Sequence, residues 1–263
     1  MSEQDYQLRF GGISRLYGIQ GAEIISQAHV MVIGIGGVGS WVAESLARTG
    51  IGHISLVDLD DVCITNTNRQ IHALNDTIGE SKVALMAQRI KQINPACQVS
   101  EIEDFVTLDN LSEVVTKDID YVVDAIDAVR VKAAMIAHCK RNKINVITIG
   151  GAGGQTDPTQ IKVDDLSRTY QDPLLAKVKN QLRRDYNFSR NVKRKFSIDA
   201  VFSTQQLVYP DNEGNVCFAK QQQEGAMRLD CSGGFGAATH VTASFAFFAV
   251  GRLLEKLIRK KSR

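Results

Sequence analysis

The chain has 263 residues, 44% of them hydrophobic, and 31 Lys and Arg against 29 Asp and Glu give a formal net charge of +2. A chain of this length and apolar content can bury a substantial core, which favours one α/β domain over 1–263 rather than two independent folds. The small net charge excludes a uniformly basic protein, so any basic character is local.

Residues 1–28 come before the first predicted strand. Met1–Asp5 is polar and the following residues mix charge with glycine, so the segment lacks the apolar core of a secretory leader. We therefore expect a cytoplasmic protein that begins with a short N-terminal segment.

A glycine-rich turn connects the first predicted strand to the first helical pattern. Val30–Ile33 is an uninterrupted apolar run, typical of a buried strand, and Trp41–Ala47 has apolar residues at helical spacing. The unpaired N–H groups and the dipole of a helix N-terminus favour an anion, and glycine lets the backbone approach it closely. The pattern therefore predicts a phosphate site formed by Gly34, Gly36, Gly37, Gly39 and Ser40.

The residues beyond the turn decide which nucleotide it holds. NAD is the ordinary ligand, with Asp58 at the end of the next strand on the ribose. However, Arg69 follows closely behind, and Lys82 begins a helical pattern, so two cations can neutralise a triphosphate. Asp127 follows another apolar strand and can hold Mg²⁺ through water, whereas Asp124 is the candidate for orienting the strand end. ATP is therefore favoured over NAD, and the candidate binding residues outside the turn are Asp58, Asp60, Asn66, Arg69, Gln70, Lys82 and Asp127, with Asp127 as the metal ligand.

Strands and helices alternate between residues 29 and 150. This alternation predicts a doubly wound, Rossmann-like, mainly parallel sheet as the ATP-binding core. Residues 151–240 carry shorter apolar runs and are expected to form a β-rich insert on the same sheet, serving as the crossover and substrate region. The predicted strands are Val30–Ile33, His53–Val57, Gln98–Ile102, Tyr121–Val123, Asn145–Ile149, Gln160–Val163, Gln206–Tyr209 and Val216–Ala219.

Residues 241–263 are predicted to form the final helix. Val241–Val250 is nearly apolar and is followed by basic residues. A membrane-spanning helix needs about 20 apolar residues, so a buried helix is favoured. Peripheral membrane contact through the basic end is the alternative.

A dense run of positive charge lies between Lys177 and Lys195. It contains eight basic residues and one acidic residue, with Tyr186, Phe188 and Phe196 interleaved or adjacent. The cations suit phosphate contacts, and the aromatic rings could stack on unpaired RNA bases. The alternative is a solvated helix face and loop.

Together these features resemble the adenylating domain of ubiquitin-activating enzymes and of the bacterial enzymes that activate sulfur-carrier proteins. The resemblance implies that the glycine turn binds ATP, that Asp58 binds the ribose and that Asp127 lies on the metal side. The family's Asn-x-x-Arg-Gln motif matches Asn66, Arg69 and Gln70, and its helix-start lysine matches Lys82. An N-terminal arginine of the family reaches the partner's ATP site, and Arg15 is its likeliest counterpart, which implies a homodimer.

Four segments are similar, more narrowly, to the bacterial tRNA threonylcarbamoyladenosine dehydratase family. They are Arg9–Gly18, Asn66–Leu74, Gly150–Gln160 and Asp230–Thr239. The resemblance implies that the threonylcarbamoyl carboxylate of a modified adenosine, beside the tRNA anticodon, is adenylated with ATP and Mg²⁺. Its carbamoyl nitrogen then closes the ring, releasing AMP.

Two other functions fit the same ATP residues. One is an enzyme that adenylates a ubiquitin-like sulfur-carrier protein. The other is a non-catalytic scaffold that docks sulfur-transfer proteins, although Arg69, Lys82 and Asp127 argue against it.

The five cysteines are scattered and contain no Cys-x-x-Cys pair, so neither a disulfide framework nor a structural zinc site is expected. Cys97 and Cys139 lie in apolar patterns and are expected in the core. Cys231 precedes Gly233 on a predicted loop, where a thiolate is favoured, and is the candidate catalytic cysteine.

Overall fold

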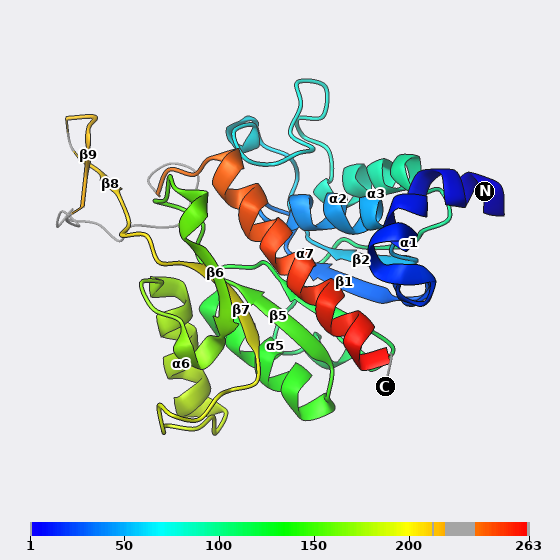
Figure 1. The fold of residues 1–263 in the computed structure, drawn as a ribbon. Coiled ribbons are helices and arrows are strands. Elements are labelled where there is room, and N and C mark those ends of the chain that lie inside the picture. Colours follow the sequence, from blue (N-terminus) through cyan, green and yellow to red (C-terminus); the bar gives the residue numbers. More distant parts are fainter. Residues whose placement is uncertain (1, 212, 219–234, 262–263) are drawn as a thin grey trace.

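A seven-stranded sheet with helices on both faces forms the molecule (Figure 1). The computed structural model describes residues 2–211, 213–218 and 235–261. The strand order is β3-β2-β1-β4-β5-β7-β6, and every neighbouring pair is parallel except β6 and β7. The predicted doubly wound, mainly parallel sheet is therefore confirmed.

The element bounds are as follows. The strands are β1 (His29–Ile33), β2 (His53–Val57), β3 (Gln98–Ile102), β4 (Tyr121–Asp124), β5 (Asn145–Ile149), β6 (Ile161–Asp165), β7 (Asp199–Ser203), β8 (Tyr209–Pro210) and β9 (Val216–Cys217). The α-helices are α1 (Glu3–Ser26), α2 (Gly39–Thr49), α3 (Lys82–Ile93), α4 (Leu111–Val114), α5 (Val129–Asn142), α6 (Pro173–Asp185) and α7 (Thr239–Lys261), and the short 3-10 turns are η1 (Ile64–Asn66), η2 (Pro158–Gln160) and η3 (Leu166–Arg168).

Two predictions in the second half of the chain are corrected. No strand was predicted at β7, because only three apolar residues separate Asp199 from Ser203 there. All five of its residues are buried, since β5 and β6 enclose the strand. The predicted strand Gln206–Tyr209 is wrong, because only Tyr209 belongs to a strand, the two-residue β8 that pairs with β9.

The core is divided between the two faces of the sheet. Residues of α2, α3 and α7 pack on one face, and residues of α4, α5 and α6 pack on the other. The apolar run in α7 lies against the first face, with Phe245 and Leu253 fully buried, as predicted for a final core helix. Among the described residues, no helix combines the length and apolar character needed to cross a membrane.

The strand order reverses direction between β1 and β4. From β1 the chain proceeds to β2 on one side, while β4 pairs with the other side. In sheets of this kind, ligands bind at such a switch point, beyond the carboxyl ends of the strands. The glycine turn follows β1 and lies at this point.

Candidate nucleotide site

Glycine is required at two positions of the turn. Gly34 has φ +89°, and a Cβ there would lie 3.1 Å from the Ala125 backbone. A Cβ on Gly39 would lie only 1.7 Å from the carbonyl oxygen of Gly34. The turn is therefore closed so tightly on itself and on the loop after β4 that no side chain fits at either position.

The N-terminus of α2 leaves polar groups available to a ligand. Its N-cap residue, Val38, provides no side-chain hydrogen bond, so the first-turn N–H groups have no side-chain cap. The Ser40 hydroxyl and the side-chain amide oxygen (Oε1) of Gln70 are buried and have no hydrogen-bond partner within the described chain. Buried polar groups are normally paired, so these atoms fit a polar ligand such as a nucleotide.

Asp58 connects the end of β2 to the glycine turn. Its Oδ2 accepts a hydrogen bond from the Ile35 N–H at 2.6 Å, and its Oδ1 accepts one from the Asp60 N–H at 2.9 Å. Each carboxylate oxygen keeps a lone pair that a ribose hydroxyl could use. Asp58, the residue predicted to bind the ribose, is thus held in place beside the glycine turn that is predicted to bind the phosphates.

Arg69 lies against the glycine turn. Its Cγ is 3.1 Å from the position of a Cβ on Gly37. Asn66 holds the backbone that leads to Arg69. Its side-chain oxygen accepts a hydrogen bond from the Cys63 N–H and its backbone carbonyl accepts one from the Arg69 N–H, both at 3.0 Å. The Trp41 indole N–H donates to the Arg69 carbonyl at 3.0 Å, a contact that sequence reasoning missed because Trp41 was assigned only to a helix face.

Lys82 is the second cation at this edge of the sheet. It is the first residue of α3, its side chain is 7% exposed, and its Nζ lies 2.8 Å from Oδ2 of the half-exposed Asp60. The Lys82 N–H also donates to the Asp60 carbonyl. Asp60, predicted either to support the ribose or to end the strand, therefore positions Lys82.

His72 is buried behind Arg69 and Gln70. Neither ring nitrogen has a hydrogen-bond partner among the described residues. Burial lowers its pKa to about 4, and the positive charges of Lys82 and Arg89 act in the same direction. His72 is therefore neutral near pH 7 and adds no charge to the site.

Asp127 is exposed on the loop that follows β4. Within the described part of the chain, no group of three His, Cys, Asp or Glu residues could hold a metal ion. Asp127 therefore fits a Mg²⁺ ion only as one protein ligand that supplements phosphate oxygens and water, which is how Mg²⁺ is usually held beside a nucleotide.

Arg15 is not brought to the glycine turn of its own chain. Helix α1 packs at the far end of α2, where the Tyr6 hydroxyl donates to the Gly50 carbonyl, and at the far end of α7, where Gly21 adjoins Ile258 (Figure 1). The Arg15 guanidinium lies near Gly11 and Gly12 and is exposed. The structure therefore places Arg15 away from the nucleotide site of its own chain.

The thiols follow the predictions where the structure describes them. Cys97 and Cys139 are fully buried, and burial raises their pKa values to about 11 and about 12. Cys231 lies outside the described residues. Ala237 lies beside the Asn-x-x-Arg-Gln segment, because the Asn68 side chain donates to the Ala237 carbonyl at 2.7 Å.

The basic run is only partly available to a ligand. The prediction that its aromatic rings are free to stack is wrong for Phe196, which is 2% exposed and packs edge-on against Phe188. Arg183 lies over the Phe196 ring, 5.3 Å from its centroid. The exposed cations are Lys177, Arg184, Arg190, Lys193, Arg194 and Lys195.

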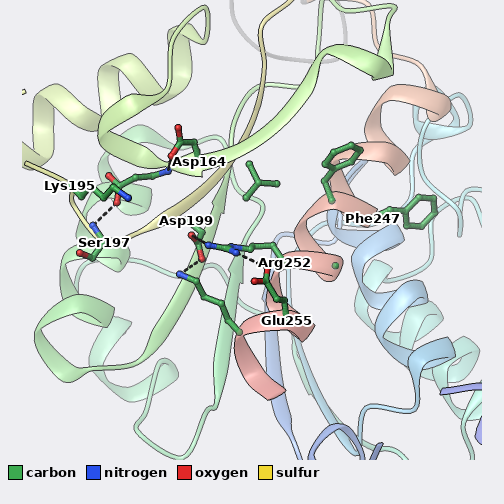
Figure 2. A pocket seen from close by; sticks show the side chains of 12 residues that line it. Asp164, Lys195, Ser197, Asp199, Phe247, Arg252 and Glu255 are labelled. Carbon is green, nitrogen blue, oxygen red and sulfur yellow. Dashed lines mark hydrogen bonds and ion pairs between the residues drawn. The ribbon is translucent and has the colours of Figure 1, made fainter. Parts of the chain in front are cut away.

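A hollow formed by described residues lies elsewhere. Its volume is about 810 Å³, and it lies between α7, the edge strand β6 and the neighbouring strand β7 (Figure 2). Asp199 accepts ion pairs from Arg252 and Lys256 there, and Phe247 forms part of the wall. No predicted nucleotide residue lines it, so it is separate from the site at the glycine turn.

Known proteins share this fold and sequence over nearly the whole chain. The ThiF family profile matches residues 11–262. The chain belongs to the ThiF family. A curated tRNA threonylcarbamoyladenosine dehydratase of Haemophilus influenzae is 58% identical over 261 residues, 98% of this ThiF-family chain and 96% of the relative. The Escherichia coli protein of that name is 56% identical over 258 residues, again 98% of this chain and 96% of the relative.

Solved structures agree with this family assignment. The structure titled E. coli tRNA N6-threonylcarbamoyladenosine dehydratase in complex with ATP superposes with a TM-score of 0.88 and 52% identity, covering 100% of this ThiF-family chain and 98% of that one. The same protein in complex with AMP gives the same values. The sequence-based family prediction is confirmed.

Proposed function

We propose that this chain is an ATP-dependent tRNA threonylcarbamoyladenosine dehydratase. The observation that carries the proposal is the tight glycine turn, with Arg69 packed on it, Asp58 after β2 and Lys82 at the start of α3. The chain is also similar over nearly its whole length to relatives of that name. The reaction adenylates the threonylcarbamoyl carboxylate of a modified adenosine in tRNA and then closes the ring.

The first step makes the carboxylate reactive. In this proposal the glycine turn and the Ser40 hydroxyl bind the ATP phosphates, and Asp58 binds the ribose. The substrate carboxylate attacks the α-phosphate and pyrophosphate leaves, while Arg69 and Lys82 stabilise the charge that develops on the phosphoryl oxygens. Asp127 would hold Mg²⁺, which would neutralise further negative charge on the phosphates.

The second step needs no nucleophile from the chain. The carbamoyl nitrogen attacks the acyl carbon, loses its proton and expels AMP. Because the attack is intramolecular, well-oriented groups gain effective molarities of about 10⁵ to 10⁸ M. In this step the protein holds the threonylcarbamoyl group of the substrate in a folded conformation and keeps water away from the acyl-adenylate.

A homodimer with a shared site is part of the proposal. Helix α1 carries three largely exposed apolar side chains, because Leu8, Leu16 and Ile19 are 80%, 72% and 83% exposed, and Gly18 kinks the helix before Ile19. A second chain would bury such side chains. Arg15 lies on the same helix, so a second chain packed there would receive it.

Mixing two inactive variants should restore activity if Arg15 acts across the dimer. Arg15→Ala and Lys82→Met leave each homodimer inactive, whereas a mixed dimer keeps one site with both residues intact. Random exchange of subunits should then give about a quarter of wild-type AMP formation. Absence of activity in a mixture shown to contain mixed dimers would place Arg15 outside the partner's site.

Exposed cations of the basic run are proposed to contact tRNA phosphates. Replacing Arg184, Lys193 and Arg194 with Gln should weaken tRNA binding about tenfold at moderate salt and reduce its salt dependence. ATP affinity should be unchanged. Filter binding at several salt concentrations would measure both effects, and an unchanged salt slope would contradict the proposed contact.

The overall function is tested with defined substrates. The protein is incubated with ATP, Mg²⁺ and threonylcarbamoyl-modified tRNA, and the nucleoside should lose the mass of one water while AMP forms. Unmodified tRNA is the control. AMP formation that requires a ubiquitin-like carrier protein instead of the modified tRNA would overturn the proposal in favour of carrier activation.

A further inference from the structure

A fully buried ion pair lies at the base of the loop that carries Asp127. Lys132, in the first turns of α5, places its Nζ 2.9 Å from Oδ1 of Asp124, the last residue of β4, and both side chains are 0% exposed. The Thr148 hydroxyl, on β5, donates to the other carboxylate oxygen at 2.7 Å. The pair thus joins the ends of β4 and β5 to α5.

The same ammonium group holds the backbone of the loop. Its Nζ donates to the carbonyl oxygen of Asp124 at 3.2 Å and to that of Ile126 at 2.9 Å. A lysine ammonium has three donors, and the three acceptors here are one side chain and two loop carbonyls. The Ile126 carbonyl belongs to the peptide that leads directly into Asp127.

The loop is also the surface against which the glycine turn packs. The Ala125 N–H donates to the Ile33 carbonyl at 2.9 Å. A Cβ on Gly34 would lie 3.1 Å from the Ala125 carbonyl group, and one on Gly39 would lie 3.4 Å from the Ala125 side chain. A shift of the loop would therefore move both Asp127 and the phosphate turn.

Stability alone does not account for the pair. Burying two charges costs so much desolvation free energy that an apolar pair of similar volume is often equally stable or more stable. An apolar side chain, however, could not donate to the two loop carbonyls. The directional contacts, rather than the charge pair as such, distinguish Lys132 from an apolar residue at this position.

We propose that Lys132 is a positioning residue that fixes the loop 125–128 beneath the nucleotide, so that Asp127 and the glycine turn keep a fixed separation. The inference rests on the proposed function for its ligand, ATP with Mg²⁺. It concerns the geometry of the chain before any ligand binds, so it can be tested without turnover.

The test combines hydrogen exchange with the Mg²⁺ requirement. The double variant Asp124→Asn, Lys132→Met removes both buried charges together, which avoids leaving one unpaired. In nucleotide-free protein, amide exchange in 125–131 should accelerate about tenfold. The Mg²⁺ concentration for half-maximal AMP formation should rise about threefold or more. The free energy of global unfolding, measured in denaturant, should fall by less than the free energy of local opening in 125–131.

Two further variants sharpen the test. Lys140→Met removes a lysine from the last turn of the same helix, where it donates to the Phe196 carbonyl, and should leave exchange in 125–131 unchanged. Thr148→Val keeps both buried charges but loosens Asp124, and should accelerate exchange in 125–131 by a smaller factor. This variant answers the question if the double variant fails to fold.

A double-mutant cycle separates positioning from a general structural effect. On an Asp127→Asn background the double change Asp124→Asn, Lys132→Met should raise the Mg²⁺ concentration for half-maximal AMP formation much less than on the wild-type background. The reason is that the Asp127 carboxylate, which Lys132 would position, is already absent. Unchanged exchange in 125–131 in every folded variant would overturn the proposal. If the wild-type protein forms no AMP, the proposed function fails, and exchange still decides whether Lys132 fixes the loop.

Discussion

Replacing Lys82 with Met should lower ATP-dependent AMP formation by about 100-fold or more, the usual effect of removing a group that stabilises charge developing in a transition state. The chain should remain folded. Its partner Asp60 has a side chain that is 55% exposed, so water can solvate the carboxylate once Lys82 is gone. AMP release with modified tRNA measures the rate, and circular dichroism checks the fold.

A second lysine of α3 provides the matched control. Lys91 lies in the last turn of the helix, and its Nζ donates to the Cys97 carbonyl at 2.6 Å, away from the glycine turn. Lys91→Met should retain AMP formation within about twofold of the wild type, because surface changes away from a site have small effects. Equal losses in the two variants would show that Lys82 acts on the fold instead of on the reaction.

Replacing Gly39 with Ala should both destabilise the chain and weaken ATP binding. The added Cβ would lie 1.7 Å from the Gly34 carbonyl oxygen, so the turn must open. We expect the free energy of unfolding to fall by about 3 kcal/mol, as in a strongly overpacked site. Denaturant unfolding and equilibrium binding of ATP would measure the two effects.

Gly251→Ala is the matched control for this change. Gly251 lies within α7, and a Cβ there meets no atom within 4 Å. Alanine should stabilise the helix by about 0.5–1 kcal/mol because it lowers the entropy lost on folding. If Gly39→Ala binds ATP as tightly as Gly251→Ala does, the turn is not the phosphate site.

The local sequence pattern was sufficient to predict a strand wherever the segment itself determines its structure. The β2, β3 and β5 strands have the predicted bounds, because apolar or alternating runs between polar turns depend little on the rest of the chain. The β7 strand is different. Its short apolar run becomes a central strand only because β5 and the antiparallel β6 pair with its two sides.

The candidate site shows the same division. The glycine turn and Arg69 were predicted from motifs, and the structure brings them into contact. Phe196 and Lys132 could not be placed in this way. An aromatic residue in a basic run resembles a surface residue, and a lysine on a helix resembles a solvated one, whereas tertiary packing buries both completely or nearly so.

The close packing of the turn on the loop after β4 has a consequence for how this family diversifies. Apart from Arg15, every residue proposed to bind ATP lies between Gly34 and Asp127, in a unit where the glycine turn packs directly on the loop after β4. Strands β7 and β6 extend the sheet at the margin opposite β3. Sequence changes at that margin can therefore accumulate without disturbing the contact between the glycine turn and the loop after β4.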